Sequence, residues 1–291
     1  MLALSSTTDV VAAVRSARDV SLAAYILRPG PVESALVDAA RHGARVRVRL
    51  EGQPFGDVRG DLAAGNRRAI EELRSAGADA RLAHEPGSAE PPLHLKALVT
   101  GDAVYLDDRN WAGDGEETIV RDTFSQDRRM VADAIAGKAD PPSPFFAAEK
   151  HDALASAARL LDSCTKRDDV ALESESFGAY NSTYYALDDL AKRGCAPRIL
   201  IADREFESNP KERAAVEALE RDGADVRITA SDEKFALVGN RAWIGSANAT
   251  AAFDRPDQLD WSVRTDNAAI VARERVVFEK RWQSAQRPSF S

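Results

Sequence analysis

The chain has 291 residues, of which 44% are hydrophobic and 30% are charged, a composition typical of a folded soluble protein. No stretch reaches the roughly 18 apolar residues of a membrane span, and no basic region precedes an apolar core at the N-terminus, which argues against a secretion signal. The net charge of −8 gives no general attraction to a polyanion, and the two cysteines, Cys164 and Cys195, are interpreted as free thiols of a cytoplasmic protein.

Apolar periodicity predicts an ordered series of elements in the first half of the chain. They are a helix around residues 10–14, a strand at 20–27, a helix at 35–43, a strand at 45–50, a helix ending near 73, two short strands at 96–99 and 104–106, and a helix at 128–135. Gly43 fits the left-handed residue that ends a helix, and Gly101-Asp102 fits a two-residue hairpin turn.

The second half repeats this series in the same order. It comprises a helix around 154–161, a strand at 170–172, a helix at 186–194, a strand at 198–201, a helix ending near 219, two short strands at 235–238 and 242–244, and a helix at 268–282. Gly194 and the pair Gly239-Asn240 take the positions of the helix end and the hairpin turn. The repetition indicates two similar halves.

A stretch rich in structure breakers separates the two halves. Residues 137–146 contain the sequence Pro-Pro-Ser-Pro, which neither a helix nor a central strand accommodates. We therefore expect a first half over residues 1–137, a Pro-rich linker over 138–150 and a second half over 151–291. Because strands alternate with helices, each half is predicted to be α/β with a mostly parallel sheet, to which the hairpin adds an antiparallel element.

One polar pattern occurs in both halves with the same spacing. His94, Lys96 and Asn110 of the first half are followed 138 residues later by Asp232, Lys234 and Asn248. In each copy the lysine enters the first hairpin strand and the asparagine follows the second. The motif is therefore conserved in spacing between the halves, whereas its histidine is present only once.

A His-x-Lys on a strand, with an asparagine in a turn about sixteen residues on, resembles the motif of the phospholipase D superfamily. That family continues with an aspartate and a Gly-Ser-x-Asn turn, and the resemblance extends over nearly the whole chain. The sequence departs from the family pattern at four places: Gly101 and Gly239 replace the aspartate, Asp107-Asp108-Arg109-Asn110 replaces the first turn, and Asp232 replaces the second histidine. The second turn is intact as Gly245-Ser246-Ala247-Asn248. The resemblance implies a pseudo-twofold α-β-β-α sandwich of two halves.

The resemblance also implies a metal-independent phosphodiester chemistry without a cofactor. One histidine attacks phosphorus to form a phosphohistidine, and the other protonates the leaving group. In this sequence His94 is expected to be the nucleophile. Lys96, Lys234, Asn110 and Asn248 are expected to hold the phosphate, with Ser246 beside them, and Glu117 and Asp260 are the expected carboxylates that orient the catalytic groups.

Asp232 leaves three interpretations open. It replaces the second histidine as a general acid, if burial near a carboxylate such as Glu117 raises its pKa. Alternatively, the site is catalytically inactive and the chain is a phosphate-binding or scaffolding module. In the third arrangement, two chains pair through their first halves and supply two copies of His94, although a monomer is the principal expectation. We favour an active hydrolase or transferase.

The expected substrate is a phosphodiester: a nucleic acid, a phospholipid headgroup or a smaller diester. The acidic charge weakens the first choice, and the absence of an amphipathic or spanning segment weakens the second. No metal site is expected, because His42, His84 and His151 share no ligand-like spacing with the cysteines.

Three further features have two interpretations each. Arg45, Arg47 and Arg49 share one face of a strand and are interpreted as a solvated or paired face rather than a phosphate track. Glu173 and Glu175 alternate on a strand and either line the site or pair with an arginine. Residues 84–92 occur only in the first half, as a surface loop or as a lip before His94.

Overall fold

The structure is a computed structural model that describes residues 2–113, 117–138, 146–202, 206, 209–230, 233–251 and 257–290. The chain forms two compact units. The first comprises Met1–Pro142 and Asp254–Trp261, and the second comprises Ser143–Phe253 and Ser262–Ser291. The first unit is therefore discontinuous in sequence, which a division at a single linker does not anticipate. The expected boundaries at residues 137 and 151 stay a prediction.

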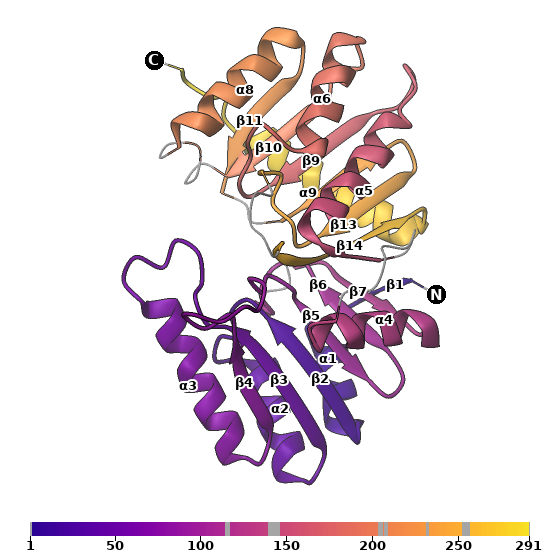
Figure 1. Ribbon diagram of the computed structural model, residues 1–291. Helices are drawn as coiled ribbons and strands as arrows, with labels where there is room; N and C mark the ends of the chain where they lie inside the picture. The colour runs from indigo at the N-terminus through magenta and orange to yellow at the C-terminus, as the bar shows by residue number, and fades with distance from the viewer. Residues whose placement is uncertain are drawn as a thin grey trace. The chain divides into compact units, whose positions relative to one another are not determined.

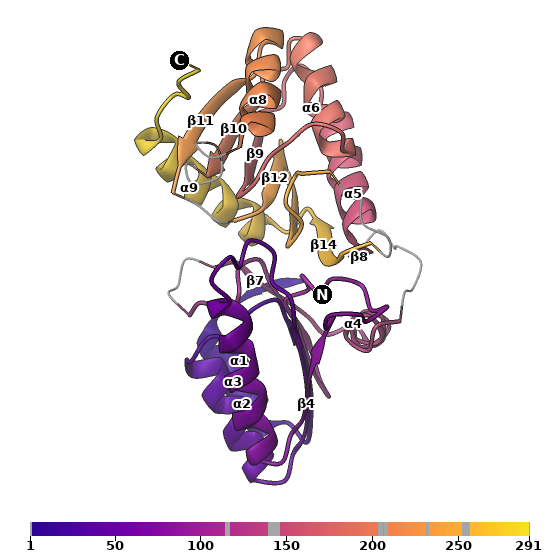
Figure 2. The same cartoon turned by 60° about the vertical axis from the view of Figure 1, so that its left-hand side comes forward.

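The first unit is built on one seven-stranded sheet with the order β1-β7-β6-β5-β2-β3-β4 in the described residues. Its elements are β1 (Ala3–Ser5), α1 (Thr7–Ser16), β2 (Asp19–Ala24), α2 (Pro31–Arg41), β3 (Arg45–Glu51), α3 (Asp61–Ser75), β4 (Asp79–Ala83), β5 (Ala97–Thr100), β6 (Val104–Asp107), β7 (Ile119–Asp122) and α4 (Ser125–Ile135). Helices α1, α2 and α3 cover one face of this sheet and α4 lies on the other (Figure 2).

The second unit has the corresponding sheet, with the order β11-β10-β9-β12-β13-β14-β8 in the described residues. Its elements are β8 (Ala147–Glu149), α5 (Lys150–Asp162), β9 (Val170–Ser174), α6 (Ser182–Lys192), β10 (Arg198–Ala202), α8 (Pro210–Asp222), β11 (Asp225–Thr229), β12 (Phe235–Val238), β13 (Arg241–Gly245), β14 (Leu259–Thr265, whose first three residues belong to the first unit) and α9 (Ala268–Ser284). Helices α5, α6 and α8 cover one face, and α9 crosses the other (Figures 1 and 2).

The predicted α/β class and the two similar halves are confirmed. The sheets are mixed rather than mostly parallel. Strands β2, β3 and β4 are parallel, but β5, β6, β7 and β1 join them through antiparallel pairs, and β12, β13 and β14 do the same in the second sheet. The hairpin is the cause, because it reverses the chain and the next strand then pairs with it.

Local sequence signals account for many helix ends. Ser6 and Asp9 form a reciprocal capping box at the start of α1. Asn181 accepts from the backbone N–H of Tyr184 at the start of α6, and Asn267 caps α9 in the same manner. Gly43 and Gly194 have positive φ values of 86° and 77°, as expected for residues that follow a helix.

Each sheet buries an apolar core against its three-helix face. Leu22, Val48 and Leu98 of the first sheet are almost fully buried in one core, and Leu172, Ile199 and Ala236 are buried in the other. Burial of this kind is the dominant favourable term in folding, and it fixes strand register because a shift by one residue would expose each side chain.

Asn66 of α3 fastens this helix to the ends of two strands. Its Oδ1 accepts a hydrogen bond from the backbone N–H of Leu27 (3.1 Å), and its Nδ2 donates to the carbonyl oxygens of Tyr25 and Glu51 (2.8 Å each). The side chain is fully buried. These bonds hold the loops after β2 and β3, which lie at the sheet edge that carries the polar motif.

We predict that Asn66→Ala lowers the free energy of unfolding by about 3 kcal/mol, because three buried backbone groups lose their partner. Urea denaturation measures the change. Ser75→Ala, at an exposed position near the end of the same helix, is the control and should change stability by less than about 0.5 kcal/mol. A loss of similar size in both variants would contradict the proposed role of the Asn66 bonds.

Candidate functional site

A short backbone pairing positions the nucleophile candidate of the first unit. Leu93 and Leu259 form a parallel bridge, in which the His94 N–H donates to Leu259 O and the Leu259 N–H donates to Pro92 O, both at 2.8 Å. All of these residues belong to the first unit. The pairing brings Asp260 beside His94, although 166 residues separate the two in sequence.

Asp260 fixes the orientation of the His94 ring. Nδ1 of His94 lies 2.7 Å from Oδ1 of Asp260, whose other oxygen accepts a hydrogen bond from Gln258 Nε2 at 2.9 Å. The Asp260 side chain is fully buried, and the His94 side chain is 12% exposed. Because a carboxylate accepts, Nδ1 carries the proton and the lone pair is on Nε2. The pair thus has the tautomer that a nucleophilic histidine requires.

Tyr25 and Lys96 pack around this histidine. The Tyr25 ring meets the His94 ring edge to face at a centroid distance of 4.7 Å, and Lys96 Nζ lies 5.5 Å from the centre of the Tyr25 ring. Lys96 Nζ also donates to the His94 carbonyl oxygen at 2.9 Å. The lysine is 1% exposed, so its charge lies in a medium of low polarity where its field is strong. Sequence reasoning missed Tyr25, which carries no motif signal.

Buried Glu51 holds the loop that leads to His94. Its Oε2 accepts a hydrogen bond from the Leu93 backbone N–H at 2.6 Å. Its Oε1 accepts one from the Gln53 backbone N–H at 2.7 Å and lies 2.8 Å from His84 Nδ1. His84 is half-buried and lies beside this carboxylate. The loop over residues 84–92 is tied to the end of β3 directly before the candidate nucleophile.

The first turn after the hairpin is rebuilt around two buried carboxylates. Asp107 Oδ2 accepts from the backbone N–H of Trp111 at 2.5 Å, and Asp108 Oδ1 accepts from the Thr118 N–H at 2.9 Å. Trp111 adopts a positive φ of 55°, which is strained for an aromatic residue. Both carboxylates accept hydrogen bonds from backbone N–H groups of the same segment. They close the turn around its own chain.

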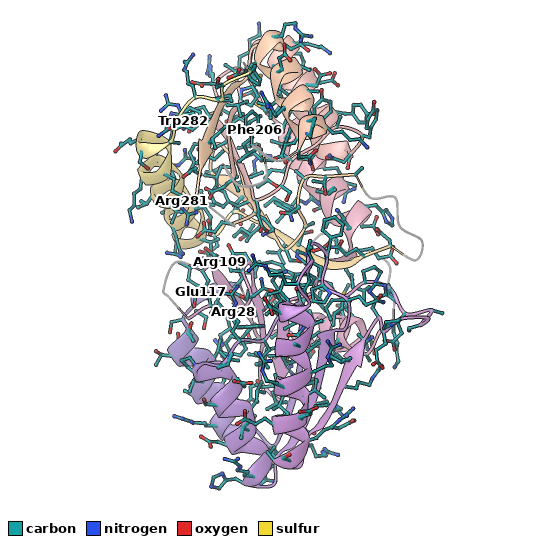
Figure 3. The ribbon with its side chains drawn as sticks, turned by 90° about the vertical axis from the view of Figure 1, so that its left-hand side faces the viewer. Arg28, Arg109, Glu117, Phe206, Arg281 and Trp282 are labelled. Atoms are coloured by element: carbon teal, nitrogen blue, oxygen red, sulfur yellow. The ribbon has the colours of Figure 1, made fainter. Side chains whose placement is uncertain are left out.

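Asn110 and Glu117 lie in the same segment between β6 and β7. Asn110 is half-buried, and its Oδ1 accepts no hydrogen bond from the part of the chain that the structure describes. Glu117 is 6% exposed and accepts a hydrogen bond from the Thr7 hydroxyl. Figure 3 labels Glu117 together with Arg109 and Arg28 in the first unit.

Burial raises the pKa of Asp107 to about 7. Loss of hydration is the largest cause, and repulsion from Glu117 adds to it, whereas the Trp111 N–H and the Lys96 charge oppose it. An unfolded aspartate titrates near pH 4. As the pH rises from 4 to 7, the unfolded chain therefore loses this proton while the folded chain keeps it, and the free energy of unfolding falls.

We predict that Asp107→Asn removes this contribution. Relative to the wild type, the variant should gain roughly 2–4 kcal/mol of stability between pH 4 and pH 7.5, because its amide stays neutral throughout. Urea denaturation at a series of pH values measures the difference. Asp102→Asn, at the exposed hairpin turn, is the control and should follow the wild-type profile. A pH-independent difference between Asp107→Asn and the wild type would refute the prediction.

In the second unit a carboxylate compensates the buried positive charge of the motif lysine. Lys234 is 3% exposed, and its Nζ lies 3.1 Å from Glu175 Oε2, so the positive charge is already paired. Ser246 is fully buried, and Asn248 Oδ1 accepts from the Ser176 N–H at 3.4 Å. Asp232 lies outside the described residues. The structure thus places Lys234, Ser246 and Asn248 in one unit and His94, Lys96, Asn110, Glu117 and Asp260 in the other.

A buried charge cluster accompanies the second motif. Arg281 NH1 lies 2.7 Å from Glu173 Oε1 and 2.8 Å from Glu233 Oε2. Both carboxylates are almost fully buried, and they raise the pKa of Arg281 against the effect of burial. Of the two interpretations that the sequence left open for Glu173, the structure shows the pairing with an arginine, whereas sequence reasoning missed Glu233. One signal could have revealed Glu233: it takes the position between the first two motif residues, where the first half has the apolar Leu95.

The glycine that replaces the family aspartate has a steric cause in the second motif. Gly239 has a φ of 56°, and a Cβ atom there would lie 2.7 Å from Asp168 Oδ1. Gly101 has open space around it, so no comparable contact explains the first replacement. The two replacements therefore have different origins.

One group of potential metal donors lies at the start of α5 in the described part of the chain. Glu149, His151 and Asp152 bring donor atoms within 4.8 Å of one another, but His151 is exposed and its contacts are those of a surface ion pair. Among the helices of the described ranges, none combines the length and apolar composition that crossing a membrane requires.

Solved structures resemble this fold. Polyphosphate kinase from Porphyromonas gingivalis matches with a TM-score of 0.62 and 14% identity, over 95% of this chain and 49% of that protein. Phosphatidylserine synthase from Haemophilus influenzae Rd KW20 matches with a TM-score of 0.65 and 10% identity, over 96% and 86%. The chain thus spans about half the length of the kinase.

A shorter match is the phospholipase D family member Nuc from Salmonella typhimurium, with 20% identity over 45% of this chain and 88% of that protein and a TM-score of 0.41. By sequence, no family profile matches the chain, and no curated protein does. The two longer structural matches extend over at least 95% of the chain. The chain therefore shares the fold of these two proteins, in agreement with the fold that its resemblance to the phospholipase D superfamily implied.

Proposed function

We propose that the chain is a metal-independent phosphodiesterase of the phospholipase D type, with His94 as the nucleophile. The hydrogen bond between His94 Nδ1 and Asp260 carries this proposal, because it fixes the ring tautomer and places the lone pair on Nε2. Lys96 adds a buried positive charge beside the histidine. The superfamily fold supports a phosphoryl-transfer chemistry.

In the proposed reaction Nε2 of His94 attacks phosphorus and a P–N bond forms. The bond from phosphorus to the leaving oxygen breaks, and its electron pair stays on that oxygen. The oxygen then receives a proton from a general acid. Water then attacks phosphorus and passes a proton to the same acid, now in its basic form. The P–N bond breaks, and a phosphomonoester is released. Asp260 stabilises the positive imidazole of the intermediate.

Asp232 is the proposed proton donor, in place of the second histidine of the family. Lys96 and Asn110 of the first motif, together with Lys234, Asn248 and Ser246 of the second, are the proposed phosphate ligands, and Glu117 is a proposed positioning residue. The substrate is proposed to be a phosphodiester from the set of nucleic acid, phospholipid headgroup and small diester. A monomeric chain and a cytoplasmic location complete the proposal.

His94→Ala is predicted to lower turnover of an aryl phosphodiester by at least about 10³-fold and to abolish a phosphoenzyme. The phosphoenzyme is trapped by quenching with alkaline detergent after addition of labelled substrate, and the label should then be lost on brief treatment with acid, because a P–N bond is acid-labile. His42→Ala removes an exposed histidine at the end of α2 and is the matched control, with unchanged turnover expected.

The second candidate function is a phosphate-binding or scaffolding module without catalysis. The ion pair between Lys234 and Glu175 favours the scaffolding form of this alternative, because a neutralised lysine binds a phosphate less strongly. Labelled DNA, RNA, phosphatidylcholine and the aryl diester form the substrate panel. If the wild type turns over none of them and forms no phosphoenzyme, the module is correct and the phosphodiesterase is not.

Two carboxylate variants separate the proposed roles by leaving group. Asp260→Asn should slow aryl and alkyl diesters alike, by roughly 10²–10⁴-fold, because an amide disturbs the tautomer of the nucleophile. Asp232→Asn should slow alkyl diesters by roughly 10²–10⁴-fold and aryl diesters much less, because an aryl oxygen leaves without a proton. Steady-state rates on both substrates measure the effects. Full alkyl diester activity in Asp232→Asn would exclude this residue as the donor.

A further inference from the structure

The two sheets carry the same pair of arginines on neighbouring parallel strands. Arg47 of β3 and Arg81 of β4 correspond to Arg198 of β10 and Arg227 of β11. In both sheets the second arginine lies two residues beyond the partner of the first in strand register. The second unit therefore shows which groups such a pair of arginines binds when a helix packs over it.

In the second unit the last turns of α9 cover both arginines. Arg198 NH2 lies 2.7 Å from Glu279 Oε1 and 2.9 Å from Asp169 Oδ2. The Arg227 guanidinium lies 4.3 Å from the centre of the Trp282 ring and donates to the Trp282 carbonyl oxygen. Figure 3 labels Trp282 on this helix. The arginines thus hold a carboxylate beside an aromatic ring.

Helix α4, the counterpart of α9, lacks these turns. Both helices begin three residues after the end of the preceding strand, but α4 has 11 residues and α9 has 17. The six additional residues of α9 are 279–284, and they include Glu279 and Trp282. In the described residues of the first unit, α4 therefore brings neither a carboxylate nor an aromatic ring to Arg47 and Arg81.

Within the described residues Arg47 also forms no salt bridge to the counterpart of Asp169, although the two charges lie close enough to interact. Asp19, which corresponds to Asp169, is bound instead by Arg45 at 2.7 Å. Arg47 is exposed, and within the described part of the chain its guanidinium donates one hydrogen bond, from Nε to Ser21 Oγ at 3.2 Å. The remaining N–H groups of Arg47 are available to a ligand.

A cavity of about 280 Å³ lies at this place, lined by Arg47, Arg49, Arg81 and Asp79 with Ile135 and neighbouring residues of α4. The Arg49 side chain is 8% exposed, and its Nε is buried without a hydrogen-bond partner among the described residues. Glu90 binds Arg49 at 3.3 Å and Arg81 at 2.8 Å. Three arginines against two carboxylates leave a positive balance.

We propose that this cavity binds a small organic oxyanion in which a carboxylate or phosphate adjoins a planar ring. The oxyanion would accept hydrogen bonds from Arg47 and Arg81, and the ring would stack on a guanidinium, as Glu279 and Trp282 do in the second unit. The site contains none of the residues proposed for phosphodiester cleavage. It is therefore a second ligand site of the chain.

The test uses indole-3-acetate, which joins a carboxylate to an indole, and its neutral analogue indole-3-acetamide. Calorimetry or ligand-observed NMR on the full chain should show saturable binding of the acid and at least about tenfold weaker binding of the amide. Phenyl phosphate is a second probe, used with His94→Ala so that binding at the proposed catalytic histidine does not contribute. It should bind this variant with an affinity similar to that of the acid.

Arg47→Gln and Arg81→Gln should each weaken the binding of both anions by at least about tenfold. Both positions are exposed, so the variants should fold, which a thermal melt verifies. Arg45→Gln removes an arginine from the same strand, outside the cavity lining, and should leave the affinities unchanged. Equal binding of the acid and the amide, or wild-type affinity in both cavity variants, would overturn the proposal.

Discussion

Buried charge is the constraint on which the rest of this structure depends. Each motif lysine lies almost completely out of water, and an ammonium in such a place is tolerated only with compensating partners. In the first unit Lys96 uses a carbonyl oxygen and the face of Tyr25, which are neutral groups. In the second unit Lys234 uses the carboxylate of Glu175. The two copies of the motif therefore surround their lysines with different groups.

The carboxylates of the two units differ in the same systematic way. Asp260 binds His94 and Gln258, and its buried position strengthens its interaction with the histidine. Glu173 and Glu233 form ion pairs with Arg281 of α9, and these ion pairs join the helix to the motif strand. In the first sheet, Ala23 and Leu95 take the corresponding positions. The second motif thus carries a structural ion cluster at positions that are apolar in the first.

Local sequence signals predicted the parts of the fold that depend on neighbouring residues. The hairpins, the closing helices and the glycines with positive φ followed from periodicity and turn chemistry, and the structure has each of them. The short strands β1 and β8 could not be predicted, because three residues show no alternation and form only through pairing with β7 and β14. The mixed character of the sheets has the same origin.

Prediction of the site had a similar limit. The motif spacing identified His94 and Lys96, and the family resemblance implied Asp260; the structure brings these three together. Tyr25 and the buried state of Asp107 depend on residues distant in sequence, and no local pattern marks them. The pairing of Glu175 with Lys234 joins two strands 59 positions apart in the numbering, which a single sequence does not reveal.

The discontinuity of the first unit has a consequence for how the chain can be divided. Its fold is completed by Asp254–Trp261, which the ribosome makes after most of the second unit. A fragment that ends at the proline-rich junction would lack the Leu259 strand pairing and the carboxylate that orients His94. The two halves repeat in sequence, yet the first unit is complete only after residues 254–261 have been synthesised.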